Sequence, residues 1–276
     1  MASTKQLLSR ILLNLLTLIL VLLTAIPYVY MAGATFRPNT ELFSLPITLF
    51  PKSLYLGNYE QLFEMFPYVR WFLNTVFVAG IRTLVAIVLC SMAGYAFAKY
   101  EFKFKRALFV LLLVTMMLPF HVVLIPLFIM MVRFQWVNTY FALIIPFAVS
   151  AYGIFLMRQY MVAVPSELID AARIDGSSEM GTFWRIALPL VRPGLGVVAI
   201  LFFTQAWNDF IWPLIVLSKT VLYTLPLGIA TMFGPYEIQY GTIMAGSFLS
   251  TLPIVIVFLA MQRQFISGLT VGALKG

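Results

Sequence analysis

Long apolar segments dominate this chain of 276 residues and limit what it can fold into. Runs of about 20 apolar residues recur between residues 11 and 262, and each can cross a hydrocarbon core of roughly 30 Å as an α-helix. Strands of a membrane barrel would instead appear as shorter segments of alternating polarity. A mean hydropathy of +0.98 with only 10% charged residues is far too apolar for a water-soluble domain of this length. The chain is therefore predicted to be an all-α integral membrane protein.

We expect about six transmembrane helices, at residues 11–32, 70–98, 107–131, 138–157, 193–217 and 240–262. The first is expected to be retained, because its apolar run continues through Pro27 to Met31 without a clear small-residue cleavage site. Prolines and glycines interrupt residues 34–68 and 218–239, so both stretches are expected to form turns and short helices outside the membrane. The resulting division is an N-terminal segment at 1–10, a membrane domain at 11–264 and a C-terminal tail at 265–276.

Lys and Arg are distributed unevenly between the two sides that six spans define, and cytoplasmic loops are the ones that retain them. One side carries Lys5, Arg10, Lys99, Lys103, Lys105, Arg106, Arg158, Arg173, Arg185, Arg192, Arg263 and Lys275. The other carries Arg37, Lys52, Arg70, Arg133 and Lys219. Both termini and the loop 159–192 are therefore expected in the cytoplasm. This topology explains the net charge of +8 better than nucleic-acid binding, for which no separate basic domain exists.

The loop 159–192 has readable local chemistry. Ser166 is expected to cap a first short helix, and Gly176 to end it in the left-handed conformation. Ser177 and Ser178 are expected to cap a second short helix, which Pro189 stops. The first helix is expected to have one small apolar face, formed by Leu168, Ala171 and Ala172. The prediction is a helix, a glycine turn and a helix, too short and too charged to cross a bilayer.

Two interpretations of this helical pair remain open from the residues alone. It is either a hairpin on the membrane surface, with Phe183 and Trp184 at the interface, or a docking element for a partner protein.

The same loop resembles a known signature. Asp170-Ala171-Ala172 is followed by three residues, Gly176, nine residues and Ile186-Ala187-Leu188-Pro189. This pattern is similar to the Glu-Ala-Ala signature loop in membrane subunits of bacterial ATP-binding-cassette importers, with Asp170 in place of the usual Glu. The segments NTVFVAGIRTLVAIVLCSMAGYAFAKYEFKFKR, AWNDFIWPLIVL and QRQFISGLTVGALKG resemble the second permease subunit of the carbohydrate (maltose-type) branch.

The resemblance implies a type I permease bundle in a bacterial inner membrane, importing oligosaccharides, disaccharides or related polyols. It also implies four kinds of partner besides membrane lipid: a different permease subunit, an ATPase dimer, an extracytoplasmic solute-binding protein and the sugar itself. The loop 166–189 would be a cytoplasmic coupling helix that contacts the ATPase. The residues that the resemblance assigns to this coupling are Glu167, Asp170, Ala171, Ala172, Arg173, Asp175, Gly176, Ile186, Leu188 and Pro189.

No phosphate-binding Gly-Lys-Ser/Thr sequence occurs in the chain. ATP and Mg are therefore expected on the partner ATPase, and the chain is expected to bind no cofactor or metal and to be no enzyme. Its one His, one Cys and scattered acids form no catalytic or metal-binding spacing. The alternative to an ATP-driven importer is an ion-coupled secondary transporter of a small polar solute, for which a single intramembrane Asp209 is a poor ion site.

Polar residues within the predicted spans are costly, so each needs a partner, water or a solute. Arg82 is expected to pair inside the bundle rather than touch solute. Asp209 is either an element of the solute path or a cap at a helix break before Pro213, and His121 follows a bend at Pro119. The candidates for the translocation path are Asn74, His121, Gln205, Trp207, Asn208 and Asp209, although interhelical hydrogen bonding is the commoner use of such side chains.

Overall fold

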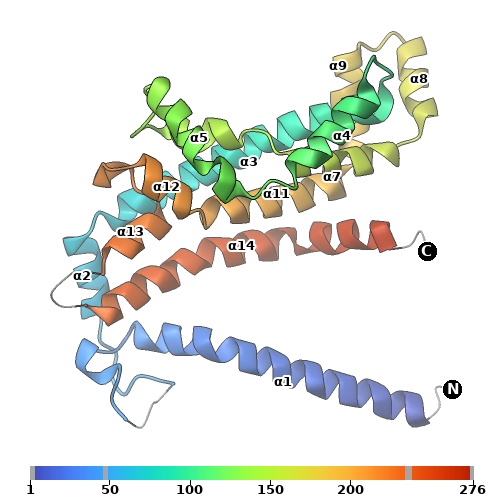
Figure 1. Ribbon diagram of the computed structural model, residues 1–276. Coiled ribbons are helices and arrows are strands. Elements are labelled where there is room, and N and C mark those ends of the chain that lie inside the picture. Colours follow the sequence, from blue (N-terminus) through green and yellow to red (C-terminus); the bar gives the residue numbers. More distant parts are fainter. Residues whose placement is uncertain (1–3, 46–48, 234–237, 274–276) are drawn as a thin grey trace. The chain divides into compact units, whose positions relative to one another are not determined.

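The computed structural model describes residues 4–45, 49–233 and 238–273, and all regular structure in that part of the chain is helical (Figure 1). This confirms the all-α prediction. Residues 1–3 of the predicted N-terminal segment and 274–276 of the tail, including Lys275, lie outside the described residues. By its internal contacts the chain divides into two compact units, one of residues 1–68 and 229–251, the other of residues 69–228 and 252–276.

The first unit contains α1 (Thr4–Ala34), the single turn η1 (Asn39–Glu41), α2 (Gly57–Met65) and the start of α14 (Tyr240–Ala273). The short elements between α1 and residue 68 are those expected for the stretch 34–68. Asn58, which is buried, holds them together, because its Nδ2 donates to the carbonyls of Thr35 at 2.9 Å and Arg37 at 2.7 Å. Tyr68 in turn donates its hydroxyl to the carbonyl of Gly246 at 2.7 Å, which ties the end of this segment to α14.

The second unit contains the remaining helices, apart from Tyr68 of α3 and residues 229–231 of α13, which belong to the first unit. In chain order they are α3 (Tyr68–Lys99), α4 (Lys105–Thr115), α5 (Phe120–Arg133), α6 (Tyr140–Ile144), η2 (Ile145–Phe147), α7 (Ala151–Val162), α8 (Ser166–Ile174), α9 (Glu179–Thr182), η3 (Phe183–Ala187), α10 (Leu188–Leu190), α11 (Arg192–Trp207), α12 (Ile211–Val216), η4 (Thr220–Leu222) and α13 (Leu225–Thr231). The unit also includes α14 from Leu252 onward.

Among the described residues, three continuous helices are long and apolar enough to cross a membrane, at Gln6–Ala34, Tyr68–Lys99 and Tyr240–Gln262. The predicted spans 107–131, 138–157 and 193–217 are not single helices. α4 and α5 meet at 101° because Pro119 has no N–H to donate and disfavours helical geometry at the residue before it. The pair α6–α7 bends by 44°, and α11 ends at Trp207, three residues before α12 begins.

α3, α7 and α11 lie side by side in Figure 1 and share one apolar core. Cys90 of α3, Met157 of α7 and Val198 of α11 are fully buried in it. Cys90 is thus a packing residue of this core. Gly153 permits the close approach of these helices, since a Cβ built on it would lie 2.6 Å from the ring of Phe202 and 2.8 Å from the sulfur of Cys90.

Replacing Gly153 by Ala is expected to destabilise the protein by about 1–3 kcal/mol, because the added methyl group overpacks the core. Gly80→Ala, at a helical position where an added Cβ meets nothing within 4 Å, is the matched control and is expected to be neutral or stabilising by up to about 1 kcal/mol. Thermal unfolding of the detergent-solubilised variants measures both. Equal unfolding midpoints would contradict this packing.

Candidate functional site

The loop between α7 and α11 forms a helix, a turn and a helix, as predicted. Gly176 has φ +79°, a conformation that side chains other than glycine rarely adopt. Ser178 caps α9 by accepting a hydrogen bond from the Gly181 N–H at 3.1 Å. The predicted cap at Ser166 is wrong, because α8 begins after Pro165 and no side chain accepts its first N–H groups.

Pro189 does not stop the second helix where the sequence suggested. The chain passes through a π-helical turn at Phe183–Ala187, continues to Leu190, and bends by 83° before α11 starts at Arg192. The wider π-turn lies directly before the proline, at the position where an α-helix would lose one hydrogen bond and clash with the ring.

A cluster of charged residues closes the glycine turn. The guanidinium of Arg173 donates to both oxygens of Glu179, at 2.8 Å and 3.2 Å, and to Asp170 at 3.0 Å. Tyr100, directly after α3, donates its hydroxyl to Glu179. The hydrogen bonds from Arg173 and then Tyr100 lower the pKa of Glu179, while burial and the bond to Glu179 raise the pKa of Tyr100 to about 12. The ionised Glu179 carboxylate therefore stabilises the folded loop fully at pH values above the ordinary carboxylate pKa. This stabilisation is lost as the pH falls through the lowered pKa of Glu179.

Lys99 supplies a second connection between α3 and the loop. Its ammonium group donates to the carbonyl of Val164 and lies 3.5 Å from the hydroxyl of Ser166, at the start of α8. Two neighbouring residues at the end of one long helix thus contact the beginning and the middle of the loop.

The loop presents one face to its own chain and one to solvent. Ile169, Ala172 and Phe183 are buried in the core shared by α3, α7 and α11 or beside it. Ala172 therefore does not lie on the same face as the exposed Leu168 and Ala171, with which the sequence grouped it, and Phe183 is buried in the protein core. Apolar side chains on the other face are exposed, by 44% at Leu168 and 86% at Ile174. Other residues that the resemblance assigns to coupling are exposed as well, among them Glu167, Asp170, Ala171, Asp175 and Pro189. Two more are half-buried, Ile186 and Leu188.

A cavity of about 620 Å³ lies elsewhere in the second unit, at the break between α11 and α12. Four predicted path residues line it, namely His121, Gln205, Asn208 and Asp209. The helix break before Pro213 is confirmed, because Asn208 and Asp209 lie between the two helices. Phenylalanine rings complete the wall, at Phe120, Phe147, Phe202 and Phe210.

Arg82 also lines this cavity and pairs with Asp209, with 2.8 Å between Nη1 and Oδ2. Its side chain is only 6% exposed, and the guanidinium carbon lies 4.1 Å from the centre of the Phe147 ring. The predicted pairing of Arg82 inside the bundle is confirmed. An arginine that is held by a carboxylate and an aromatic face is neutralised without water.

Two predicted path residues lie outside the cavity. Asn74 donates to the carbonyls of Val221 and Tyr223, both at 2.9 Å, and accepts from the hydroxyl of Tyr140, so its role is interhelical hydrogen bonding. Trp207 is buried between Phe72 and Phe203. Sequence reasoning missed the contribution of Ser150 and the four phenylalanines, which no motif distinguishes from ordinary packing residues.

Comparison with known proteins assigns the chain to a family. Residues 86–271, well over half of the chain, match the family described as binding-protein-dependent transport system inner membrane component. The chain belongs to this family. It is thus a permease of the inner membrane, as the sequence predicted.

Several relatives of this permease are similar along nearly their whole length. The arabinooligosaccharides transport system permease protein AraQ of Halalkalibacterium halodurans is 44% identical over 253 residues, which cover 91% of each chain. The AraQ protein of Bacillus subtilis is 39% identical, covering 97% of this chain and 96% of its own. The lactose transport system permease protein LacG of Rhizobium radiobacter is 34% identical, covering 92% of each.

The fold of this permease matches a solved structure as well. A crystal structure of a bacterial ABC transporter involved in the import of the acidic polysaccharide alginate contains a chain that superposes with a TM-score of 0.87. The match covers 96% of this chain and 99% of the other at 20% identity, which establishes a shared fold.

Removing the carboxylate of Asp209 is expected to leave Arg82 charged and unpaired. Asp209→Ala should cost about 3–5 kcal/mol, and the double variant Arg82→Met with Asp209→Ala should recover most of this loss. The control is Glu101→Ala, which breaks the exposed pair with Lys105 and should cost no more than about 1 kcal/mol. Unfolding of the purified variants measures all three, and additive losses in the double variant would contradict direct pairing.

Proposed function

We propose that this permease is one of two different membrane subunits of an ATP-driven importer of oligosaccharides or related sugars. In this proposal the loop 166–189 docks on a separate ATPase, and the cavity at the α11–α12 break belongs to the translocation path. ATP and Mg are bound by the ATPase, whereas this chain binds no cofactor. Both termini and the loop face the cytoplasm.

The observation that carries the coupling role is the two-sided loop. Its apolar side chains Leu168 and Ile174 are exposed, which would not stabilise a hairpin that contacts only water. Such side chains suit a helix that lies in the groove of another protein. Its buried side chains Ile169 and Phe183 pack with the core of the membrane helices. A force on the exposed face is therefore transmitted through packed side chains rather than through a flexible connection.

The sugar class is supported by relatives and by cavity chemistry. The relatives carry arabinooligosaccharides and lactose according to their names. In this chain, Gln205, Asn208 and Ser150 bring neutral hydrogen-bonding groups to the cavity, and four phenylalanine rings supply flat apolar surface. Hydroxyl groups and apolar ring faces are what a neutral sugar presents, so the lining matches this solute class.

A solute-binding protein is the expected source of the sugar. A bacterial alginate ABC transporter with a similar fold was crystallised in complex with an alginate pentasaccharide-bound periplasmic protein. Ion-coupled transport, the alternative considered from the sequence, has no comparable support. The acid in the described cavity lining is Asp209, and Arg82 already neutralises it, so it offers no free site for a driving cation.

The docking role predicts that a charge on the exposed face of α8 detaches the ATPase. In the assembled transporter, Ile174→Glu should reduce the amount of ATPase that co-purifies, and ATP-dependent uptake with it, by about tenfold or more, because an apolar contact is replaced by a buried charge. Val221→Glu is the matched control, since Val221 is an exposed apolar residue in η4, away from the loop.

The two measurements separate docking from general damage. Val221→Glu should keep the ATPase bound, and Ile174→Glu should still insert and purify with the second permease subunit. Full retention of the ATPase and of uptake by Ile174→Glu would overturn the assignment of this loop.

A further inference from the structure

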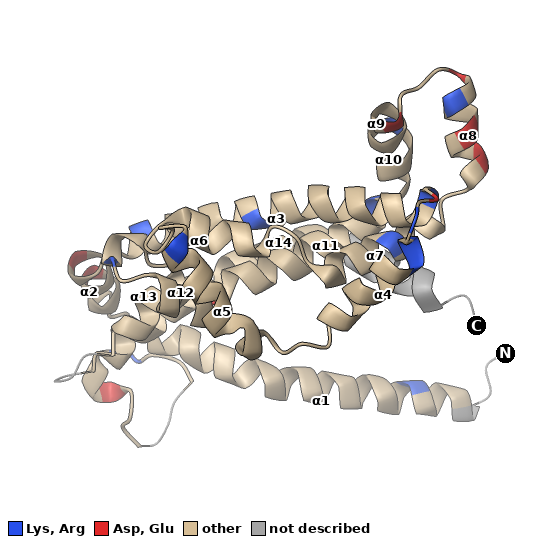
Figure 2. Ribbon diagram, turned by 45° about the horizontal axis from the view of Figure 1, so that its top comes forward, with Lys and Arg blue, Asp and Glu red and all other residues tan. Residues whose placement is uncertain are grey.

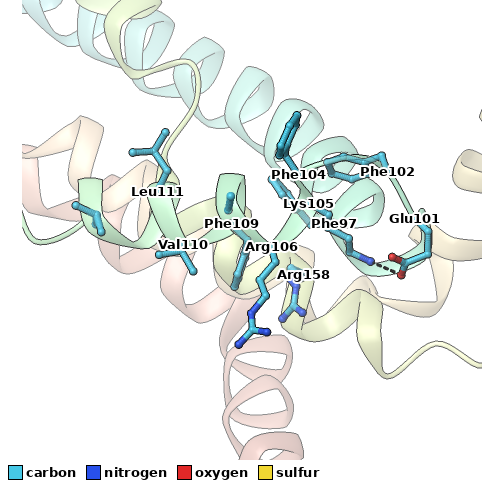
Figure 3. A pocket seen from close by; sticks show the side chains of 12 residues that line it. Phe97, Glu101, Phe102, Phe104, Lys105, Arg106, Phe109, Val110, Leu111 and Arg158 are labelled. Atoms are coloured by element: carbon cyan, nitrogen blue, oxygen red, sulfur yellow. Dashed lines mark hydrogen bonds and ion pairs between the residues drawn. The ribbon is translucent and has the colours of Figure 1, made fainter.

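A broad recess lies where α3 ends and α4 begins, apart from the loop contacts and from the cavity at Asp209. It has a volume of about 980 Å³ and is drawn in Figure 3. Its residues come from the end of α3, the turn after it, most of the length of α4, and Arg158 of α7. Figure 2 shows that the basic residues of this turn lie at the same end of the second unit as α8 and α9.

Two arginines in this recess have no anionic partner within the described part of the chain. Lys105 is paired with Glu101 at 2.8 Å, whereas Arg106 and Arg158 take part in no ion pair there. Arg158 lies with its guanidinium carbon 4.3 Å from the centre of the Phe109 ring, and its Nε is buried without a hydrogen-bond acceptor. Figure 3 shows both arginine side chains extending in the same direction.

This arrangement is electrostatically incomplete. Two like charges that point the same way repel one another, and a buried N–H without an acceptor costs free energy. One anion between the two guanidinium groups would remove both costs. Arginine forks match the oxygens of a phosphate, which makes a phosphate group the natural counter-ion.

The remainder of the recess is apolar. Val110, Leu111 and Val114 follow the arginines along α4 and are 52%, 59% and 49% exposed. A free phosphate ion would gain no binding free energy from this apolar surface, whereas an acyl chain would gain it by covering the surface. The neighbouring helix α3 is a membrane-spanning candidate that ends at Lys99, and lipid headgroups are expected near the ends of such helices.

We propose that this recess binds one anionic phospholipid, with its phosphodiester between Arg106 and Arg158 and an acyl chain along Val110, Leu111 and Val114. The site needs neither ATP nor a transported solute, and so it stands apart from the proposed import function. A bound lipid would also order the turn between α3 and α4, next to the Lys99 contact with the start of the loop.

The test uses the assembled transporter in nanodiscs of phosphatidylcholine that contain increasing amounts of phosphatidylglycerol with identical acyl chains. Native mass spectrometry after release measures how many phosphatidylglycerol molecules remain bound. Arg106 is exposed, so Arg106→Gln should fold, and it should weaken retention by about fivefold. Lys103→Gln is the matched control, because it removes one charge from the same turn outside the recess and should leave retention unchanged.

Each alternative outcome overturns the proposal in a different way. Equal losses in Arg106→Gln and Lys103→Gln would mean that the turn attracts anionic lipid only through its overall charge. Equal thermal stabilisation by inorganic phosphate and by phosphatidylglycerol would make the ligand a free anion. A photo-crosslinker at Val110 that captures the second permease subunit instead of lipid would make the recess a protein interface.

Discussion

The ion pair between Arg82 and Asp209 is the interaction on which the interior of the second unit depends. A charged group in a membrane-spanning helix needs a partner that the lipid cannot supply. Arg82 finds it in the break after α11, 127 residues away in sequence, and stacks on Phe147 as well. The pair therefore stabilises an interrupted helix and at the same time forms one wall of a cavity that contains hydrogen-bonding groups and aromatic rings.

Two helices connect this cavity to the loop. α3 contacts Asp209 through Arg82 and the loop through Lys99, and Tyr100, the next residue, contacts the loop as well. Arg82 and Lys99 are about 26 Å apart along the helix axis. α11 leaves the loop at Arg192 and ends at Trp207, beside the same cavity. Both helices share a core with Ile169 and Phe183 of the loop, so packed side chains connect the loop to the helices that border the cavity.

Sequence reasoning predicted the features that depend on local chemistry. Gly176 and Ser178 specify the turn because a left-handed residue and a side-chain cap act within a few residues. The apolar runs specify helices because lipid offers the backbone no hydrogen-bond partners, so the N–H and C=O groups must bond within the segment. Features that depend on distant packing were missed. Ala171 and Ala172 are chemically identical, and only the core beneath α8 decides which one is buried. Likewise, the bond from Tyr100 to Glu179 joins residues 79 positions apart, and no local pattern reveals it.

A cysteine at position 205 tests most directly whether the proposed docking of an ATPase on the loop 166–189 changes access to the cavity at the α11–α12 break. Cys90 is the only natural cysteine and is buried, so Gln205→Cys gives one reactive thiol in the cavity wall. In the assembled transporter, the rate of labelling by a membrane-impermeant maleimide should change when ATP is added, and this change should shrink when Tyr100→Phe removes one loop contact. A labelling rate that is the same with and without ATP would contradict the account.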